Sequence, residues 1–237
     1  MFEQVKMFYN FFLKTRKPSI LRCWIIICIL FYGNYGHNVY GEKIYIAIGQ
    51  QGLHIRAGNG GTFIARRINN VFKPVIVAGG AAGTDDEIEQ EDILMANGRT
   101  DQFGGNSTIY KNINKNIGSS GECTLEDGYT GGAGFNVNPS LDHLNKRCVG
   151  DVPKCFKDGL RGGILKEGYL QDNGGFGGGG MRGIGGGGGY TGGNGGGTSA
   201  GSGGGGSFNL DPNGENSIGN VGTGICTIRL ISKSSQW

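Results

Sequence analysis

Short runs of β-branched and alternating apolar residues predict strands near both ends of the chain. Residues 44–48 alternate large apolar side chains with less apolar ones, which is typical of a half-buried strand. Residues 62–68 and 74–78 are two further candidates, and the Asn-Asn pair at 69–70 tolerates the left-handed conformations of a tight hairpin turn. Residues 225–231 are again rich in β-branched side chains. The pattern therefore predicts an all-β chain.

Helical periodicity is weak throughout the chain. The best candidate, residues 85–96, opens with acidic side chains, which a helix dipole favours at that end. It predicts either one short helix or an acidic loop. Residues 98–173 mix polar turn residues with isolated aromatic residues, so we expect short strands linked by long loops there.

Glycine accounts for 51 of the 237 residues and for two residues in three between 174 and 206. A flexible linker is the simplest interpretation, because glycine loses more backbone entropy on ordering than any other residue. Single large residues interrupt the glycine blocks, however, and strand-like sequence resumes after them. We therefore expect packed, extended helices of the polyproline-II type whose peptide groups hydrogen-bond to one another. The expected wedges between these helices are Phe176, Met181, Ile184, Tyr190 and Phe208.

The N-terminus has the pattern of a secretory signal. Basic residues between 14 and 22 precede an apolar run at 23–32, which suits a signal peptide and is too short for a membrane-spanning helix. A cleavage point after Gly41 would make residues 1–41 a signal peptide. An uncleaved signal anchor and a wrongly assigned start are the alternatives.

Four cysteines remain after residue 41, namely Cys123, Cys148, Cys155 and Cys226. In an oxidising compartment they predict two disulfides, and the sequence leaves all three connectivities open. The same compartment makes Asn106, in the triplet Asn-Ser-Thr, a predicted glycosylation site.

Charge and motif content argue against several classes of function. The formal net charge is +3 and much of it lies before residue 23, so we expect no nucleic-acid partner. The G-x-G-x-x-G match at 183–188 is trivial in a glycine run, and it lacks the flanking strand and helix of a nucleotide site. Kinase motifs, a histidine partner for the serines of the glycine run and Cys-x-x-Cys pairs are absent from the sequence. The chain is therefore expected to have no enzymatic activity, no cofactor and no metal.

One acidic run is the densest charge feature beyond the signal. Its carboxylates belong to Asp85, Asp86, Glu87, Glu89, Glu91 and Asp92. The run is either a docking surface for a basic partner or an ordinary solvated face.

Several segments occur in the order found in one receptor family. They are IAIGQQG at 46–52, GNGGTFI at 58–64, PVIVAGGAAG at 74–83, GYTGGAGF at 128–135, GGFGGGG at 174–180 and GGGGGYTGGN at 185–194. Residues 42–232 thus resemble the extracellular glycine-rich domain of the anaplastic lymphoma kinase and leukocyte tyrosine kinase receptors. One half-cystine of that family is missing near residues 181–184. The family's growth-factor-like module, membrane span and kinase do not occur before Trp237.

The resemblance implies a jelly-roll β-sandwich like that of tumour necrosis factor, packed with a bundle of polyglycine-II helices. Residues 42–173 would form the sandwich part with the disulfides, 174–207 the glycine helices and 208–237 a return strand. In the family this unit binds small basic secreted proteins at the cell surface and thereby promotes homodimerisation of the receptor. A structural extracellular glycine-rich protein with no ligand is the alternative.

A first prediction concerns processing. In secreting cells the chain should lose about 41 residues and carry one glycan at Asn106, because of its N-terminal pattern and its single acceptor triplet. N-terminal sequencing and the mobility shift after glycosidase treatment measure both. A soluble cytosolic product that retains Met1 would contradict the prediction.

Overall fold

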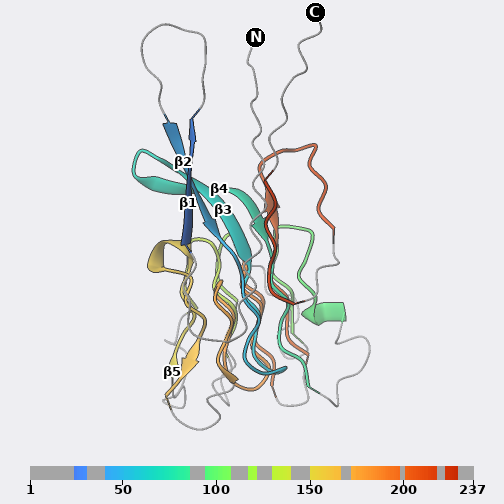
Figure 1. The fold of residues 1–237 in the computed structure, drawn as a ribbon. Coiled ribbons are helices and arrows are strands. Elements are labelled where there is room, and N and C mark those ends of the chain that lie inside the picture. The colour runs from blue at the N-terminus through green and yellow to red at the C-terminus, as the bar shows by residue number, and fades with distance from the viewer. Residues whose placement is uncertain are drawn as a thin grey trace, which may run out of the picture.

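The computed structural model describes residues 24–30, 41–85, 94–107, 117–121, 130–139, 150–166, 172–197, 201–217 and 222–228. Within these ranges the chain is mostly extended, and strands are its main ordered elements (Figure 1). Five strands form one antiparallel sheet in the order β1-β2-β3-β4-β7, and β5 pairs with β6 in a second. The prediction of an all-β chain is confirmed.

The main sheet contains three of the four predicted strands, with small shifts at their ends. β2 spans Gly41–Ala47, β3 spans Thr62–Ile68 and β4 spans Val71–Ala78. β7 has only two residues, Phe208–Asn209, and pairs with β4 at the sheet edge. The second sheet is a pair of two-residue strands, β5 at Gly150–Asp151 and β6 at Ile164–Leu165.

The hairpin between β3 and β4 forms as the Asn-Asn pair predicts. Asn69 and Asn70 have φ angles of 49° and 64°, the left-handed values that a two-residue primed turn requires. The turn is closed by Ile68 opposite Val71. Because such turns match the twist of the flanking strands, these two residues set the register next to the turn, and a register shift between Ile64 and Ala65 changes it further along the hairpin.

The structure places a strand, β1 (Trp24–Leu30), in the predicted signal segment. β1 pairs antiparallel with β2 over its whole length, from Trp24 opposite Ala47 to Leu30 opposite Gly41. Cleavage after Gly41 would therefore remove one strand of the sheet and leave β2 at its edge. Whether the segment is cleaved stays a prediction.

One face of the main sheet packs against an aromatic core. The sheet contributes Ala47, Phe63, Ala65 and Val77, and later segments contribute Phe135, Phe156, Leu160 and Phe176. Phe156, in the short 3-10 helix η1 (Phe156–Asp158), stacks on Phe135 with ring centroids 5.0 Å apart. Aromatic contacts of this kind add to the burial of apolar area, so this cluster joins the sheet to the middle of the chain.

The opposite face of the sheet is covered unevenly. Ile46 and Ile76 both lie on this face, in the same cross-strand row, yet they are 3% and 43% exposed. Residues 222–228 approach one end of it, where Gly224 donates to the Gly49 carbonyl at 2.9 Å. In the predicted strand at 225–231, the described residues contain only an isolated bridge at Ile228, and 229–231 lie outside the described ranges.

Below the sheet in Figure 1, the glycine-rich segments run side by side as extended chain. Every residue from 175 to 197 is buried except Arg182 and Tyr190, which are half-buried, and residues 201–206 are buried too. Three of the expected wedges, Phe176, Met181 and Ile184, are at most 9% exposed. Such burial is that of a packed segment and not of a linker.

We call the glycine-rich segments at 174–197 and 201–206, with the segments that they bond to, the glycine layer. The backbone hydrogen bonds of this layer change direction with a period of three residues. In order, the N–H groups of residues 186 to 190 donate to the carbonyls of Thr130, Gly203, Asn59, Ala133 and Gly206. The first and fourth acceptors belong to one neighbouring segment, and the second and fifth belong to another. In a β-strand the direction would alternate with a period of two.

Glycine is required here because neighbouring backbones occupy the space of a side chain. A Cβ atom on Gly187 would lie 2.1 Å from the Gly80 carbonyl oxygen, and one on Gly58 would lie 2.1 Å from that of Gly186. Both distances are far inside van der Waals contact, and the obstructing atoms are backbone. A methyl group at either position therefore has to push two segments apart.

The second prediction tests this layer. Gly187→Ala should destabilise the fold by about 3 kcal/mol or more, the upper range of overpacking, because only backbone movement can relieve the clash. Gly195→Ala is a matched control, since its Cβ would meet the nearest backbone atom at 3.0 Å. In thermal unfolding, Gly187→Ala should lower the melting temperature more than Gly195→Ala does. Equal stability of Gly187→Ala and the parent, with fast amide exchange at 185–189, would contradict a packed layer.

Candidate functional site

Asp85, the first residue of the predicted acidic patch, forms an ion pair with Arg56. An oxygen of the Asp85 carboxylate lies 3.0 Å from a terminal nitrogen of Arg56, and the Asp85 side chain is only 12% exposed. The backbone beside it is fixed as well, because Thr84 donates to the Ile55 carbonyl at 2.8 Å. Asp86, Glu87, Glu89, Glu91 and Asp92 lie outside the described residues. Residues 94–96, the described end of the predicted helix or loop, are helical.

A second carboxylate lies close to this pair. Asp172 is 6% exposed, and an oxygen of its carboxylate lies 3.2 Å from Nδ1 of His54. Burial raises the pKa of Asp172, while the charges of His54 and Arg56 act in the opposite direction. The loop at residues 54–56 is therefore joined to the start of the acidic run by the Arg56–Asp85 ion pair, and it also contacts Asp172 through His54.

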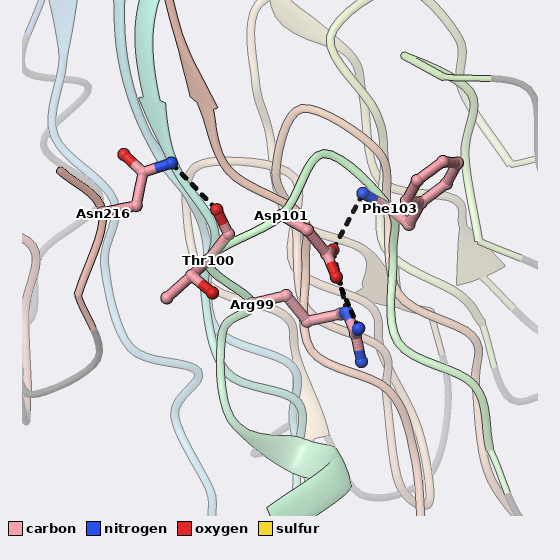
Figure 2. Close-up of polar contacts among 5 residues, drawn as sticks. All are labelled: Arg99, Thr100, Asp101, Phe103 and Asn216. Carbon is pink, nitrogen blue, oxygen red and sulfur yellow. Dashed lines mark hydrogen bonds and ion pairs between the residues drawn. The ribbon is translucent and has the colours of Figure 1, made fainter. Parts of the chain in front are cut away.

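After the acidic run the chain forms an exposed loop at residues 99–103 that is held by several hydrogen bonds. Figure 2 shows the Asp101 carboxylate between the Arg99 guanidinium and the backbone N–H of Phe103, at distances of 2.6–3.1 Å. Asn216, from the loop that follows β7, donates its side-chain amide to the Thr100 carbonyl at 2.8 Å. The loop therefore presents Phe103, which is 51% exposed, on a fixed backbone.

Sequence reasoning missed this loop. An Arg-x-Asp triplet before an aromatic residue is a local signal for it, but such triplets are common in solvated loops. The contacts that fix the loop are not local, because Ser207 donates to the Asp101 carbonyl at 2.7 Å and Arg99 donates to that of Gly205 at 2.9 Å. Only the packing of the glycine segment brings these residues together.

The ion pair also sets the titration of Asp101. The hydrogen bond from Arg99 is the largest cause that lowers the pKa of Asp101, and partial burial opposes it. A lowered folded-state pKa adds stability above the ordinary aspartate value, and this stability is lost as the pH falls through the folded-state value. Both side chains are more than two-fifths exposed, so the contribution to global stability is small.

The predicted modification sites are only partly described. Asn106 is exposed, whereas the next residue, Ser107, is fully buried. Cys155 and Cys226 are free thiols in the structure, and Cys123 and Cys148 lie outside the described residues. Burial raises the pKa of the Cys155 thiol to about 11. The two disulfides therefore stay a prediction.

In the part of the chain that the structure describes, no group of three or more histidine, cysteine or acidic residues is arranged to hold a metal ion. None of the helices within the described ranges is long and apolar enough to cross a membrane.

No protein-family model and no curated protein sequence matches the chain. The candidate site consists of the charged and aromatic side chains described around Asp85 and Asp101.

The third prediction concerns the loop at 99–103. Arg99→Gln should raise the pKa of Asp101 toward the ordinary aspartate value, because it removes the main cause of the low value. Carbon-13 NMR of the Asp101 carboxyl group across a pH titration measures the change. Lys154→Gln, which removes a cation elsewhere, should leave the titration of Asp101 as it is in the parent. An identical titration in parent and Arg99→Gln would show that the ion pair does not form in solution.

Proposed function

We propose that the chain is an extracellular glycine-rich ligand-binding module resembling the ectodomain of the anaplastic lymphoma kinase and leukocyte tyrosine kinase receptors. It enters the secretory pathway and acts at the cell surface or outside the cell. It has no catalytic role of its own and uses no cofactor. Its partner is a small basic secreted protein, and binding brings two copies of the chain together.

The observation that carries the proposal is the threefold direction of the backbone hydrogen bonds. The N–H groups of residues 186–190 turn to three neighbouring segments in succession. A polyproline-II helix has three residues per turn and no internal hydrogen bonds, so its peptide groups point outward in three directions. The same period occurs at residues 203–207, whose N–H groups donate to Asn194, Met95, Gly80, Thr191 and Asp101. This pattern supports a bundle of polyglycine-II helices, the unit that sets the receptor family apart.

The other half of the proposed fold is a jelly-roll sandwich like that of tumour necrosis factor. Two features support it. The main sheet has one face on the aromatic core. Its opposite face is buried at Ile46, close to where residues 222–228 approach. The proposed return strand, residues 208–237, begins at β7, which pairs with β4 at the edge of the main sheet.

The proposed bundle also indicates where binding occurs. Its peptide groups bond to one another, and its glycines offer no side chains with which to distinguish partners. Specificity therefore comes from side chains at the ends and edges of the layer. The acidic run at 85–92 is the proposed contact for the basic ligand, with Asp85 held in place by Arg56. The charge complementarity acts mainly on the rate of association.

The fourth prediction tests the ligand site. Neutralising Glu87, Glu89 and Glu91 together should slow association with an immobilised basic ligand of the receptor family and flatten its dependence on salt, because exposed charges are screened beyond about 8–10 Å. Biosensor rates at several ionic strengths measure the effect. The control neutralises Asp211 and Glu215, two exposed acids of the loop after β7, and should keep the parental rates.

Two outcomes oppose different parts of the proposal. If the ligand binds and the triple variant associates at the parental rate in low salt, the acidic run is a solvated face and the site lies elsewhere. If the parent binds no basic ligand of the family, the ligand-binding role itself fails and a structural extracellular protein takes its place.

A further inference from the structure

Two exposed aliphatic side chains lie next to the start of the acidic run. Leu53 and Ile55 belong to the loop between β2 and β3, and they are 61% and 48% exposed. The carbonyl of Ile55 accepts a hydrogen bond of 2.8 Å from the N–H of Thr84, the residue that precedes Asp85. Arg56, the residue after Ile55, forms the ion pair with Asp85. The backbone of this loop and the start of the acidic run are therefore direct neighbours.

The other end of the acidic run is also followed by an exposed aliphatic side chain. Leu94 begins the described helical residues at 94–96 and is 70% exposed. Ala96 is fixed beside the start of the run, because its carbonyl accepts a hydrogen bond of 2.7 Å from the N–H of Ala82. Residues 82–85 and 94–96, which bracket the run, thus lie side by side. Apolar side chains are exposed next to both ends of the run.

The loop holds its two aliphatic residues in place without a partner. The N–H of Leu53 donates to the Asn173 carbonyl at 3.3 Å, and the N–H of Ala57 closes a turn on the His54 carbonyl at 3.0 Å. The loop is thus hydrogen-bonded on both sides of Ile55. Ordering it on binding therefore costs little entropy.

The charge around this loop is mainly negative. Residues 82–92 contain six acidic residues and no lysine or arginine, and the loop at 53–57 adds one arginine. The guanidinium of that arginine pairs with the first of the six acids. Asp172 and Arg182, whose N–H donates to the Asp172 carbonyl at 3.0 Å, add one charge of each sign. This balance is complementary to a basic partner, and the aliphatic residues are complementary to an apolar one.

We propose that Leu53 and Ile55 form the apolar part of the ligand site, and that the ligand segment bound there is amphipathic, with an apolar face bordered by lysine or arginine. The inference rests on the proposed function and adds the chemistry of the contact. Basic side chains meet the acidic run, and apolar side chains cover the aliphatic pair. Protein interfaces have this form, an apolar centre with a polar rim. The acids then act on the rate of association and the aliphatic pair on the lifetime of the complex.

Other occupants are poorer matches to this surface. A purely polar polycation would contact the acidic run but would leave the two aliphatic side chains in water. An anionic membrane would be repelled by the run. A second copy of the chain in a symmetric contact would bring two acidic runs together, which is unfavourable. Only an amphipathic basic segment makes use of both kinds of side chain.

Dissociation rates test the apolar part of the site. Leu53→Ser with Ile55→Ser should leave the association rate with an immobilised basic ligand of the receptor family unchanged and raise the dissociation rate by roughly tenfold or more, because apolar contacts are lost at constant charge. The matched control is Leu210→Ser with Ile117→Ser, which removes a leucine and an isoleucine that are each 48% exposed outside this loop. It should keep the parental rates, and thermal unfolding should show that both variants are folded.

Two synthetic probes make the test independent of the family ligand. The parent should bind a leucine–lysine peptide, with its leucines on one face, roughly tenfold more tightly than polylysine of equal charge, and the variant at Leu53 and Ile55 should lose this preference. That result without any binding of a family ligand would overturn the proposed function and support the amphipathic site. Parental dissociation rates and an unchanged peptide preference in the same variant would overturn the inference and leave the basic-ligand proposal standing.

Discussion

The close approach of one backbone to another is the constraint on which this structure depends. In the glycine layer the carbonyl oxygen of a neighbouring segment lies where a Cβ would be, as at Gly187 and Gly58. This spacing lets each peptide group bond to a different neighbour, so the layer is held together by hydrogen bonds instead of side-chain packing. It also explains the composition of the chain, because any other residue at these positions would separate the segments and leave buried peptide groups unpaired.

Such a layer has to be joined to a conventional core, and aromatic side chains make the connection. Tyr190, which ends one glycine block, packs against Phe135 and Phe208 with ring centroids 6.2 Å and 4.6 Å away. Phe135 in turn stacks on Phe156 in the core beneath the sheet. Hydrophobic burial of these few large residues helps offset the high entropic cost of ordering glycine. The large residues between glycine blocks are therefore structural anchors.

The sequence predicted those features that depend on local chemistry. The β3–β4 hairpin was predictable because Asn69 and Asn70 favour the turn by themselves, and the wedges Phe176, Met181 and Ile184 stand out against glycine. The neighbours of each glycine segment were not predictable, since identical residues carry no information about register. For the same reason the loop at 99–103 was missed, because its position depends on Gly205 and Ser207. At the candidate site, the sequence identified Asp85 as part of an acidic patch but not its ion pair with Arg56.

The extended course of the chain separates two ends of different chemistry. From Val71 the chain runs through β4 and on to Asp85 without a helix, so the hairpin tip and Asp85 lie up to about 45 Å apart at the rise of a strand. The hairpin strands contain cations and no acidic residue, whereas Asp85 begins the acidic run, so the two ends differ in charge. The layer between them offers few side chains. Side chains that could distinguish one partner from another therefore lie at the ends and edges of the glycine layer, where the described chain has them.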